Sequence, residues 1–284
     1  MAKLSWSLKA MTTSILLEDR GVIEVSGTEA GKFLHNLVTN NVINLSPGQA
    51  CFAALLSPQG KIQADFFIFM QTAESYFLDC SKHLILDLIQ RLKLYKLRSQ
   101  VVISDRSLEL SVYAFPDTHE PPAIIMVSFA RDSRASFGWR VIALKNSISP
   151  SATFASYETQ RILLGLPSGG VDFAYGDAYP HETNMDALAG IDFSKGCYVG
   201  QEVVSRMKHR SQVRKRITRY HATPQAPPPG TPITADDIEI GLTGSQAGST
   251  GLAMIRRDRL ALAIQSGKTP MADHLYLDFP LEPD

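Results

Sequence analysis

One octapeptide, KGCYVGQE from Lys195 to Glu202, holds the residues best suited to chemistry. Its two glycines lie four residues apart, and a glycine costs about 1 kcal/mol inside a helix. We therefore expect Gly200 near the N-terminus of a helix that runs from Gln201 to about His209. Glu202 then lies in the first turn, where the helix dipole favours negative charge. The Cys197 thiol lies just outside that positive end.

A positive environment favours the thiolate form of Cys197, which is both the nucleophile and the metal ligand. Lys195 is one nearby cation. A downstream cationic run supplies seven more: Arg206, Lys208, Arg210, Arg214, Lys215, Arg216 and Arg219. We predict that Cys197 is a reactive thiol whose pKa is lowered by Lys195 and by this run. The alternative is a small buried hydrophobic residue, a common state of a lone cysteine.

The cationic run allows three interpretations. It is a solvated helix face that leads into a strand, an anion site for the carboxylates or phosphates of a small ligand, or a contact for the RNA backbone. RNA-binding surfaces usually add aromatic side chains that stack on bases. The run contains none before Tyr220, so the RNA interpretation is the least favoured.

A second group of titratable residues lies in the loop PHETNMD, residues 180–186. His181 and Glu182 form an acid–base pair or, because adjacent residues rarely point at one atom, Glu182 serves as a local cap. His181 and His209 lack metal-ligand spacing with each other or with a cysteine, so we expect no metal site. The sequence contains no serine-nucleophile, phosphate-loop or dinucleotide-binding motif, so the common enzyme classes are unsupported.

The composition is that of an ordinary globular protein, with 44% hydrophobic and 20% charged residues in a chain of 284. Its net charge is zero, so no global field draws it to nucleic acid or to an anionic membrane. Three cysteines without a CxxC pair argue against a disulfide framework and suit a reducing compartment. No apolar run is long enough to cross a bilayer. We expect a soluble monomer without membrane contact, in a bacterial cytoplasm or, in a eukaryote, the mitochondrial matrix.

Hydrophobic periodicity predicts four helices and a series of strands. The helices are expected at residues 28–40, 83–94, 157–164 and 201–209. The strands are expected at residues 21–25, 51–56, 62–69, 76–80, 101–104, 108–115, 124–129 and 138–144, with a hairpin turn at 57–60.

The order of these elements predicts an α+β protein with three lobes. The first lobe is discontinuous and comprises residues 1–48 and 146–212. An inserted, ferredoxin-like lobe comprises residues 49–145. Five prolines between residues 223 and 232 and the glycines beyond them are typical of a small β-barrel, which we expect over residues 213–284.

Together these motifs resemble the YgfZ family of folate-binding, T-protein-like proteins, whose mitochondrial relatives assist the maturation of [4Fe–4S] enzymes. The octapeptide KGCYVGQE is the most specific part of the resemblance. It is preceded by RILLGLP at 161–167, Asp172-Phe173 and PHETNM at 180–185. Looser similarity extends over most of the chain, through residues 20–22, 58–61 and 251–253.

The resemblance implies a three-domain ring around a central channel that holds tetrahydrofolate or a derivative. It also implies that Cys197 lies at the functional centre. The residues expected to contact the folate are Tyr198 by stacking, Arg206 and Arg214 at the glutamate tail, and in addition Asp65, Gly200, Gln201 and Glu202. Arginine–carboxylate hydrogen bonds are among the stronger kind.

The wider superfamily includes the glycine-cleavage aminomethyltransferase, and this chain departs from that enzyme at two positions. The enzyme's paired aspartates fall on Ala64 and Asp65, and its pterin-binding glutamate falls on Leu163. Leucine accepts no hydrogen bond, and losing such a partner costs about 1–3 kcal/mol. Aminomethyl transfer by the usual route is therefore disfavoured, and whether the chain is an enzyme is left open.

Three functions follow. The leading hypothesis is a tetrahydrofolate-binding accessory protein for the maturation or repair of iron–sulfur enzymes, including radical enzymes that modify tRNA. Cys197 would act by thiolate or disulfide exchange, or by transient contact with a cluster. The second is a folate-dependent aminomethyl or one-carbon transferase that uses Asp65. The third is a tRNA-binding protein that uses the cationic run.

Overall fold

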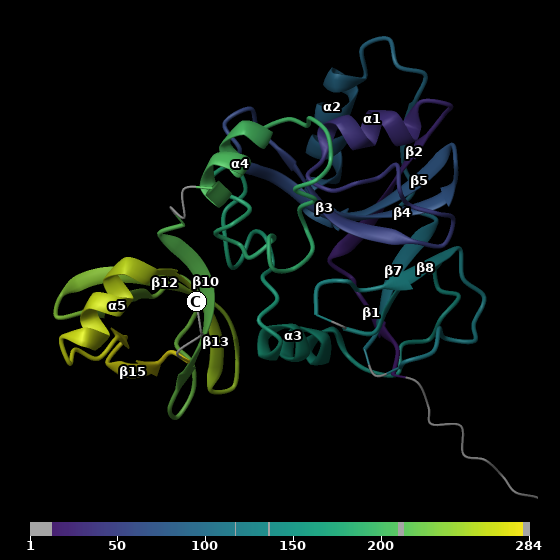
Figure 1. Ribbon diagram of the computed structural model, residues 1–284. Helices are drawn as coiled ribbons and strands as arrows, with labels where there is room; N and C mark the ends of the chain where they lie inside the picture. The colour runs from purple at the N-terminus through teal and green to yellow at the C-terminus, as the bar shows by residue number, and fades with distance from the viewer. Residues whose placement is uncertain (1–12, 117, 136, 210–212, 281–284) are drawn as a thin grey trace, which may run out of the picture.

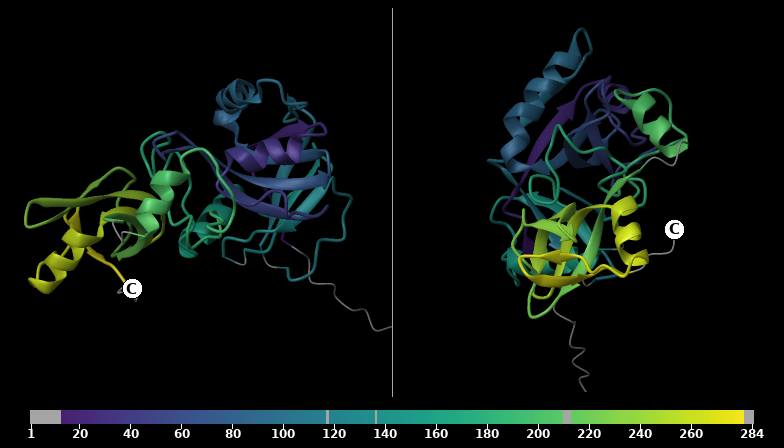
Figure 2. Two further views of the ribbon diagram at one scale, coloured as in Figure 1. Left: turned by 45° about the horizontal axis from the view of Figure 1, so that its top comes forward. Right: turned by 90° about the vertical axis from the view of Figure 1, so that its left-hand side faces the viewer.

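Two antiparallel sheets and a closed β-barrel make up the protein, seen here as a computed structural model (Figure 1). The structure describes residues 13–116, 118–135, 137–209 and 213–280. Arg210 of the cationic run falls outside these ranges. The barrel occupies one end of the molecule and the two sheets occupy the other (Figures 1 and 2).

The five-stranded sheet has the order β3-β4-β5-β2-β6, with antiparallel pairing between all neighbours. Helices α1 (Ala30–Leu37) and α2 (Ile85–Lys96) pack on one face, and α2 follows the short 3-10 helix η1 (Lys82–Leu84). The strands are β2 (Arg20–Ser26), β3 (Ala50–Leu56), β4 (Ile62–Thr72), β5 (Ser75–Ser81) and β6 (Val102–Asp105).

Strand β4 shows that this sheet is buried on both faces. Successive side chains of a strand point to opposite faces. Phe66 and Ile68 belong to the core formed with α1 and α2, whereas Phe67 and Phe69 belong to the core between the two sheets. Asp65 has the same register as Phe67, so its carboxylate points to the middle of the molecule.

The four-stranded sheet has the order β1-β7-β9-β8 and packs near the second face of the first sheet. Helix α3 (Phe154–Leu163) follows it. Its strands are β1 (Ile15–Leu16), β7 (Leu110–Phe115), β8 (Ser128–Arg131) and β9 (Trp139–Leu144).

A buried network of charges joins the two sheets. Asp79 of β5 accepts hydrogen bonds from Arg20 of β2, at 2.7 Å, and from Arg140 of β9. Arg140 also bonds to Asp132, at 3.2 Å, and Asp132 pairs with Arg134 at 2.7 Å. Because each buried carboxylate has more than one cationic partner, the network fixes the position of one sheet on the other.

Strand β2 changes the expected lobe arrangement. It belongs to the segment 1–48 that the sequence assigned to a first lobe, yet it pairs with β5 and β6 of the segment 49–145. The boundary expected at residue 48 therefore does not separate two sheets. Periodicity identifies a strand but carries no information on its pairing partners, so the lobe boundaries stay a prediction.

The C-terminal part forms the expected small barrel, in which six strands close in the order β10-β13-β12-β11-β14-β15. Helix α4 (Gln201–His209) precedes the barrel, and α5 (Arg257–Gln265) packs on it. The strands are β10 (Lys215–Ala222), β11 (Pro232–Ala235), β12 (Ile238–Ala247), β13 (Thr250–Arg256), β14 (Met271–Ala272) and β15 (Leu275–Asp278).

A buried group of hydrogen bonds joins the barrel to α3 and to the segment that follows α3. Arg161 of α3 bonds to Asp172 at 3.1 Å and to the Ser245 hydroxyl of β12 at 2.7 Å. Ser245 in turn donates from its backbone N–H to Asp172 at 2.6 Å.

Within the described part of the chain, no helix has the length and apolar character needed to cross a membrane.

Candidate functional site

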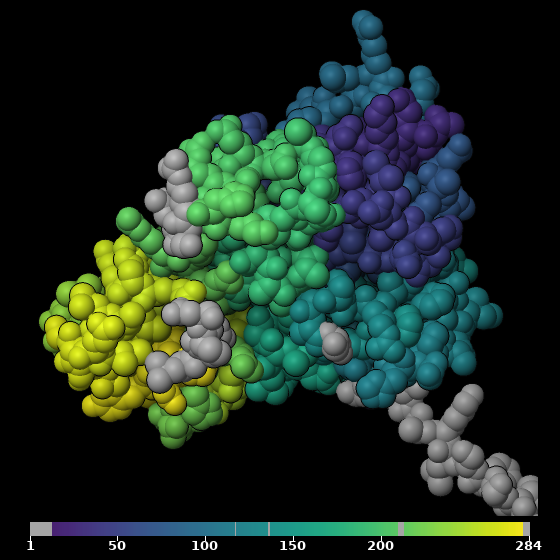
Figure 3. All heavy atoms as spheres, viewed as in Figure 1, coloured from purple at the N-terminus to yellow at the C-terminus, as the bar shows by residue number. Residues whose placement is uncertain are grey.

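Cys197 is the exposed thiol of this protein, whereas Cys80 is buried and Cys51 is half-buried. Burial raises the pKa of both Cys51 and Cys80 to about 12. Those two sulfurs are therefore held as neutral thiols. Cys197 comes shortly before α4, and this part of the chain lies between the barrel and the N-terminal region on the face that Figure 3 shows. The structure thus presents one thiol to the surroundings.

Gly200 packs the start of α4 directly on the turn between β3 and β4. Its φ of +82° favours glycine, and an added Cβ would lie 2.7 Å from the carbonyl oxygen of Ser57. A Cβ on Gly60 of the same turn would lie 2.8 Å from Cβ of Val203. By contrast, a Cβ on Gly196 would meet nothing within 4 Å. Gly200 is therefore needed for close packing, while Gly196 borders open space beside the thiol.

Lys195 anchors the thiol segment to the end of α1. Its side chain is 7% exposed, and its ammonium donates to the carbonyl oxygens of His35, Val38 and Asn40 at 2.5, 2.6 and 3.0 Å. Burial lowers the pKa of Lys195 to about 8, although the three carbonyls favour the charged form. Since an ammonium has three donors, all of them are used in holding this segment.

Tyr198 lies in the core rather than on an open surface. It is 8% exposed and packs in the cluster between the sheets. Its ring centroid is 4.9 Å from the Lys195 ammonium, and burial raises the pKa of its hydroxyl to about 12. The stacking partner that the sequence expected for a folate is thus occupied by a neighbouring cation.

Arg206 and Arg214 meet in one pocket at the seam between α4 and the barrel. This seam pocket has a volume of about 380 Å³ and is lined by Tyr179, Glu182, Val203, Arg206, Met207, Arg214, Lys215 and Arg256. Its lining combines apolar side chains, such as Val203 and Met207, with several cations. Such a site suits a ligand with an apolar body and carboxylates or phosphates at one end.

The charges of the seam pocket are only partly neutralised. Arg206 pairs with Glu202 at 2.5 Å on the exposed surface of α4, while Gln201 begins that helix and is half-buried. Arg214 and Lys215 are exposed, and neither has an ion pair with a residue that the structure describes. These two cations therefore have hydrogen-bonding capacity left for an anion.

Tyr179 and Lys61 also belong to this neighbourhood, and sequence reasoning did not select them. The Lys61 ammonium lies 3.6 Å from the centroid of the Tyr179 ring. Glu182 accepts a hydrogen bond from the Tyr179 backbone N–H at 2.8 Å, and burial raises its pKa. Glu182 is thus a local cap, as one interpretation of the sequence held. The sequence feature that could have identified Lys61 is its place beside the hairpin turn on which Gly200 packs.

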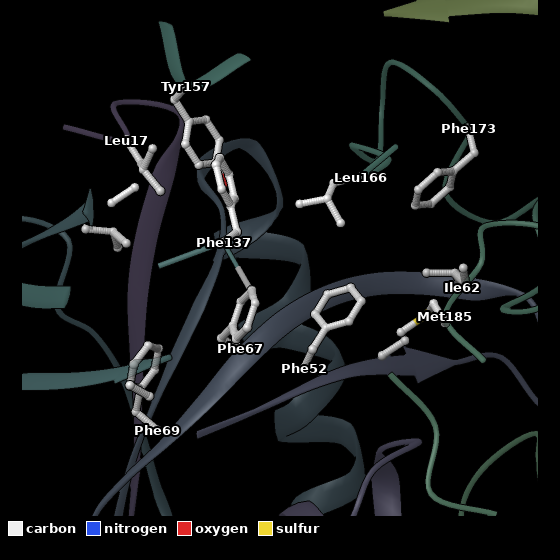
Figure 4. Packing of buried hydrophobic residues seen from close by; sticks show 14 of the residues in the cluster. Leu17, Phe52, Ile62, Phe67, Phe69, Phe137, Tyr157, Leu166, Phe173 and Met185 are labelled. Carbon is white, nitrogen blue, oxygen red and sulfur yellow. The ribbon is translucent and has the colours of Figure 1, made fainter. Parts of the chain in front are cut away.

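Asp65 lies in the middle of the molecule, but the space beside it is closed. It is 7% exposed and accepts a hydrogen bond from the Tyr175 hydroxyl at 2.5 Å. The cavity it borders measures only about 10 Å³. Phe52, Phe173 and Met185 line this cavity and belong to the core between the sheets (Figure 4).

These dimensions decide the fit of a reduced folate. Ligand pockets usually measure about 300–1,000 Å³, so the cavity of about 10 Å³ that the described residues leave beside Asp65 does not accommodate a pterin. Leu163 of α3, which the resemblance aligns with the aminomethyltransferase glutamate, is 47% exposed and offers no side-chain hydrogen bond to a pterin. The described residues include no group of three or more His, Cys, Asp or Glu side chains arranged for a metal ion.

Two regions of the chain match known domains. Residues 17–115 match the GCVT N-terminal domain, and residues 214–275 match the C-terminal β-barrel domain of CAF17. The fold is similar to the glycine cleavage system aminomethyltransferase T of Bartonella henselae, with a TM-score of 0.74 at 13% identity over 94% of this chain and 84% of that one. The expected α+β, T-protein-like fold with a C-terminal barrel is confirmed.

Curated relatives cover most of the chain. A mitochondrial iron–sulfur cluster assembly factor IBA57 homolog of Mycosarcoma maydis is 32% identical over 271 residues, which are 88% of this chain and 66% of that protein. The mitochondrial iron–sulfur cluster assembly factor IBA57 of Mus musculus is 28% identical over 284 residues, or 87% of this chain and 78% of the mouse protein. The chain thus spans about two thirds of the fungal relative's length.

Proposed function

Because this chain belongs to the YgfZ/CAF17 family, which includes the IBA57 iron–sulfur cluster assembly factors, we propose that it assists iron–sulfur cluster assembly through Cys197. The observation that carries the proposal is the exposure of this one thiol between two fixed points, Lys195 and Gly200. A thiolate is the usual ligand of iron in such clusters. Cys197 therefore offers the kind of ligand that an iron–sulfur cluster requires.

A single thiolate supplies one ligand, whereas a cluster generally takes four. We propose that the other ligands come from the protein that delivers or receives the cluster, so that Cys197 contacts the cargo only while that partner is bound. The clients would include [4Fe–4S] enzymes, among them radical enzymes that modify tRNA. The protein would act as a monomer in a reducing compartment, the mitochondrial matrix or the cytoplasm.

We propose the seam pocket as the place where tetrahydrofolate would bind. Arg214 and Lys215 would pair with its glutamate carboxylates, and Val203 and Met207 would contact its ring system. The closed space at Asp65 gives it no place there. We therefore assign folate no chemical step. The same closure weighs against a one-carbon transferase, because the Asp65 carboxylate is already bound by Tyr175.

The test compares two cysteine variants in cells that depend on this protein. Cys197→Ala should abolish the activity of a client [4Fe–4S] enzyme while the abundance of the client protein stays unchanged. Cys51→Ala removes a thiol that is half-buried and neutral, so it should leave client activity near the wild-type level. Full client activity in Cys197→Ala would remove the thiol from the mechanism.

A further inference from the structure

Three side chains form a stack around Phe193, which itself belongs to the segment that carries Cys197; the His181 and Phe193 rings are tilted by 43°. The His181 ring lies 5.9 Å from the ring of Phe193, centroid to centroid. The Lys208 ammonium lies 3.7 Å from the centroid of the same Phe193 ring. The stack connects the loop before the octapeptide, the start of the thiol segment and the end of α4. Phe193 is 37% exposed, so these two contacts contribute to its position.

His181 is buried without a hydrogen-bond partner. Its side chain is 2% exposed, and both ring nitrogens lack a partner among the described residues. A neutral imidazole carries one N–H and one acceptor nitrogen, and neither is hydrogen-bonded to a described residue. Buried polar groups are normally satisfied. This exception indicates that packing contacts hold the His181 ring in place, and that burying its two polar nitrogens costs free energy.

Burial is the main cause that opposes the protonation of His181. Burial lowers the pKa of His181, Arg216 of β10 and Lys208 of α4 lower it further, and Asp186 raises it. The Asp186 carboxylate is already engaged by Arg216, at 2.6 Å. An imidazolium in this place would thus face two cations, and the nearby anion is already shared.

We propose that His181 is a positioning residue for the thiol segment, residues 192–198, and that it holds this segment only while its ring is neutral. A protonated ring has no acceptor inside the stack and leaves it for water. Phe193 then loses one of its two neighbours, and the segment on which Cys197 lies becomes mobile. The consequence for cluster assembly rests on the function proposed above, but the coupling of His181 to the segment does not.

Hydrogen exchange of the full-length protein tests the coupling. Amide exchange of residues 192–198, corrected for its intrinsic pH dependence, is compared at about pH 7.5 and about pH 5.5, the range in which histidine titrates. We expect protection of this segment to fall at the lower pH, by up to about tenfold, since a single proton is taken up. Protection of strand β4 should hold at both values. An equal loss in β4 would indicate global unfolding and overturn the proposal.

His181→Phe is the decisive variant, because a phenyl ring keeps the stack and cannot take a proton. Its thermal unfolding near neutral pH establishes that it folds. The segment should then be protected equally at both pH values. If the loss of protection at low pH persists in His181→Phe, another group is responsible and the proposal fails.

Two further variants separate this device from a purely structural role. Lys208→Met keeps a side chain over Phe193 and removes a repelling cation, so the midpoint of the exchange transition should move to higher pH. Asp186→Asn removes the attracting carboxylate, so the midpoint should move to lower pH. Opposite shifts support the proposal, and shifts in one direction or no shifts contradict it.

Discussion

The Lys195 ammonium lies 2.6 Å from the carbonyl oxygen of Val38, although 157 residues separate the two along the chain. Val38 is the C-cap of α1, where unsatisfied carbonyls and the helix dipole both favour a cation. The residue two positions before the thiol therefore connects the thiol segment to the N-terminal half of the protein. Whether Lys195 also activates Cys197, as the sequence suggested, stays a prediction.

Replacing this lysine should loosen the segment and destabilise the protein. Lys195→Met removes one charged donor from three carbonyls, and hydrogen bonds to charged groups contribute about 1.5–3 kcal/mol. The desolvation of a 7% exposed lysine offsets part of that gain. We expect the free energy of unfolding, measured by denaturant titration, to fall by about 1–3 kcal/mol. An equally stable Lys195→Met protein would show that the anchor has no energetic role.

The two glycines of the octapeptide give a matched pair of substitutions. Gly200→Ala puts a Cβ 2.7 Å from the Ser57 carbonyl oxygen at a φ of +82°, so we expect it to cost about 1–3 kcal/mol of stability. Gly196→Ala adds the same methyl where no atom lies within 4 Å and should be within about 0.5 kcal/mol of the wild type. Thermal unfolding of both variants measures the difference. Equal stabilities would contradict the close packing of Gly200.

Gly200 also shows which features the sequence was able to predict. The cost of a glycine within a helix placed the start of α4 after it, and α4 begins at Gln201. The expected strands at 51–56 and 62–69 correspond to β3 and β4, because apolar runs bounded by turn residues carry that information locally. The barrel followed from its glycines and prolines in the same way.

Contacts between distant segments were beyond such reasoning. Asp65 and Tyr175 are 110 residues apart. Nothing in the local sequence around either residue reveals that the Tyr175 hydroxyl donates a hydrogen bond to the Asp65 carboxylate. The same holds for β2, whose place between β5 and β6 depends on tertiary pairing. The sequence left Tyr198 open between a core position and a ligand contact, because a tyrosine beside glycines is compatible with both, and the structure has it 8% exposed.

The seam pocket predicts a salt-sensitive interaction with carboxylate ligands. If the pocket binds the tail of tetrahydrofolate, Arg214→Ala should weaken binding by about tenfold, the effect of losing one charged hydrogen bond of about 1.4 kcal/mol. Isothermal titration calorimetry at low and high salt measures it, because exposed charges are screened. Arg98→Ala removes another exposed arginine, which follows α2 and does not line the pocket, and should leave the affinity unchanged. Equal affinities of the two variants would exclude Arg214 as a ligand contact.

The charges between the two sheets predict an acid-dependent loss of stability. Burial by itself raises the pKa of Asp79, but Arg140 and Arg20 outweigh it and hold this pKa below its ordinary value. The folded protein therefore binds fewer protons than the unfolded chain in the acid range, so the contribution of Asp79 is present above about pH 4 and is lost as the pH falls below it.

Arg140→Met isolates this contribution. It leaves Asp79 and Asp132 each with one cationic partner fewer in a buried place, so we expect a loss of about 3 kcal/mol near neutral pH. The gap between variant and wild type should narrow below about pH 4, where the carboxylates take up protons. Arg91→Met, which breaks an exposed pair with Asp87, should cost no more than about 0.5 kcal/mol at any pH. Denaturant titrations across the acid range distinguish the two, and a gap that stays constant with pH would show that Arg140 contributes through packing alone.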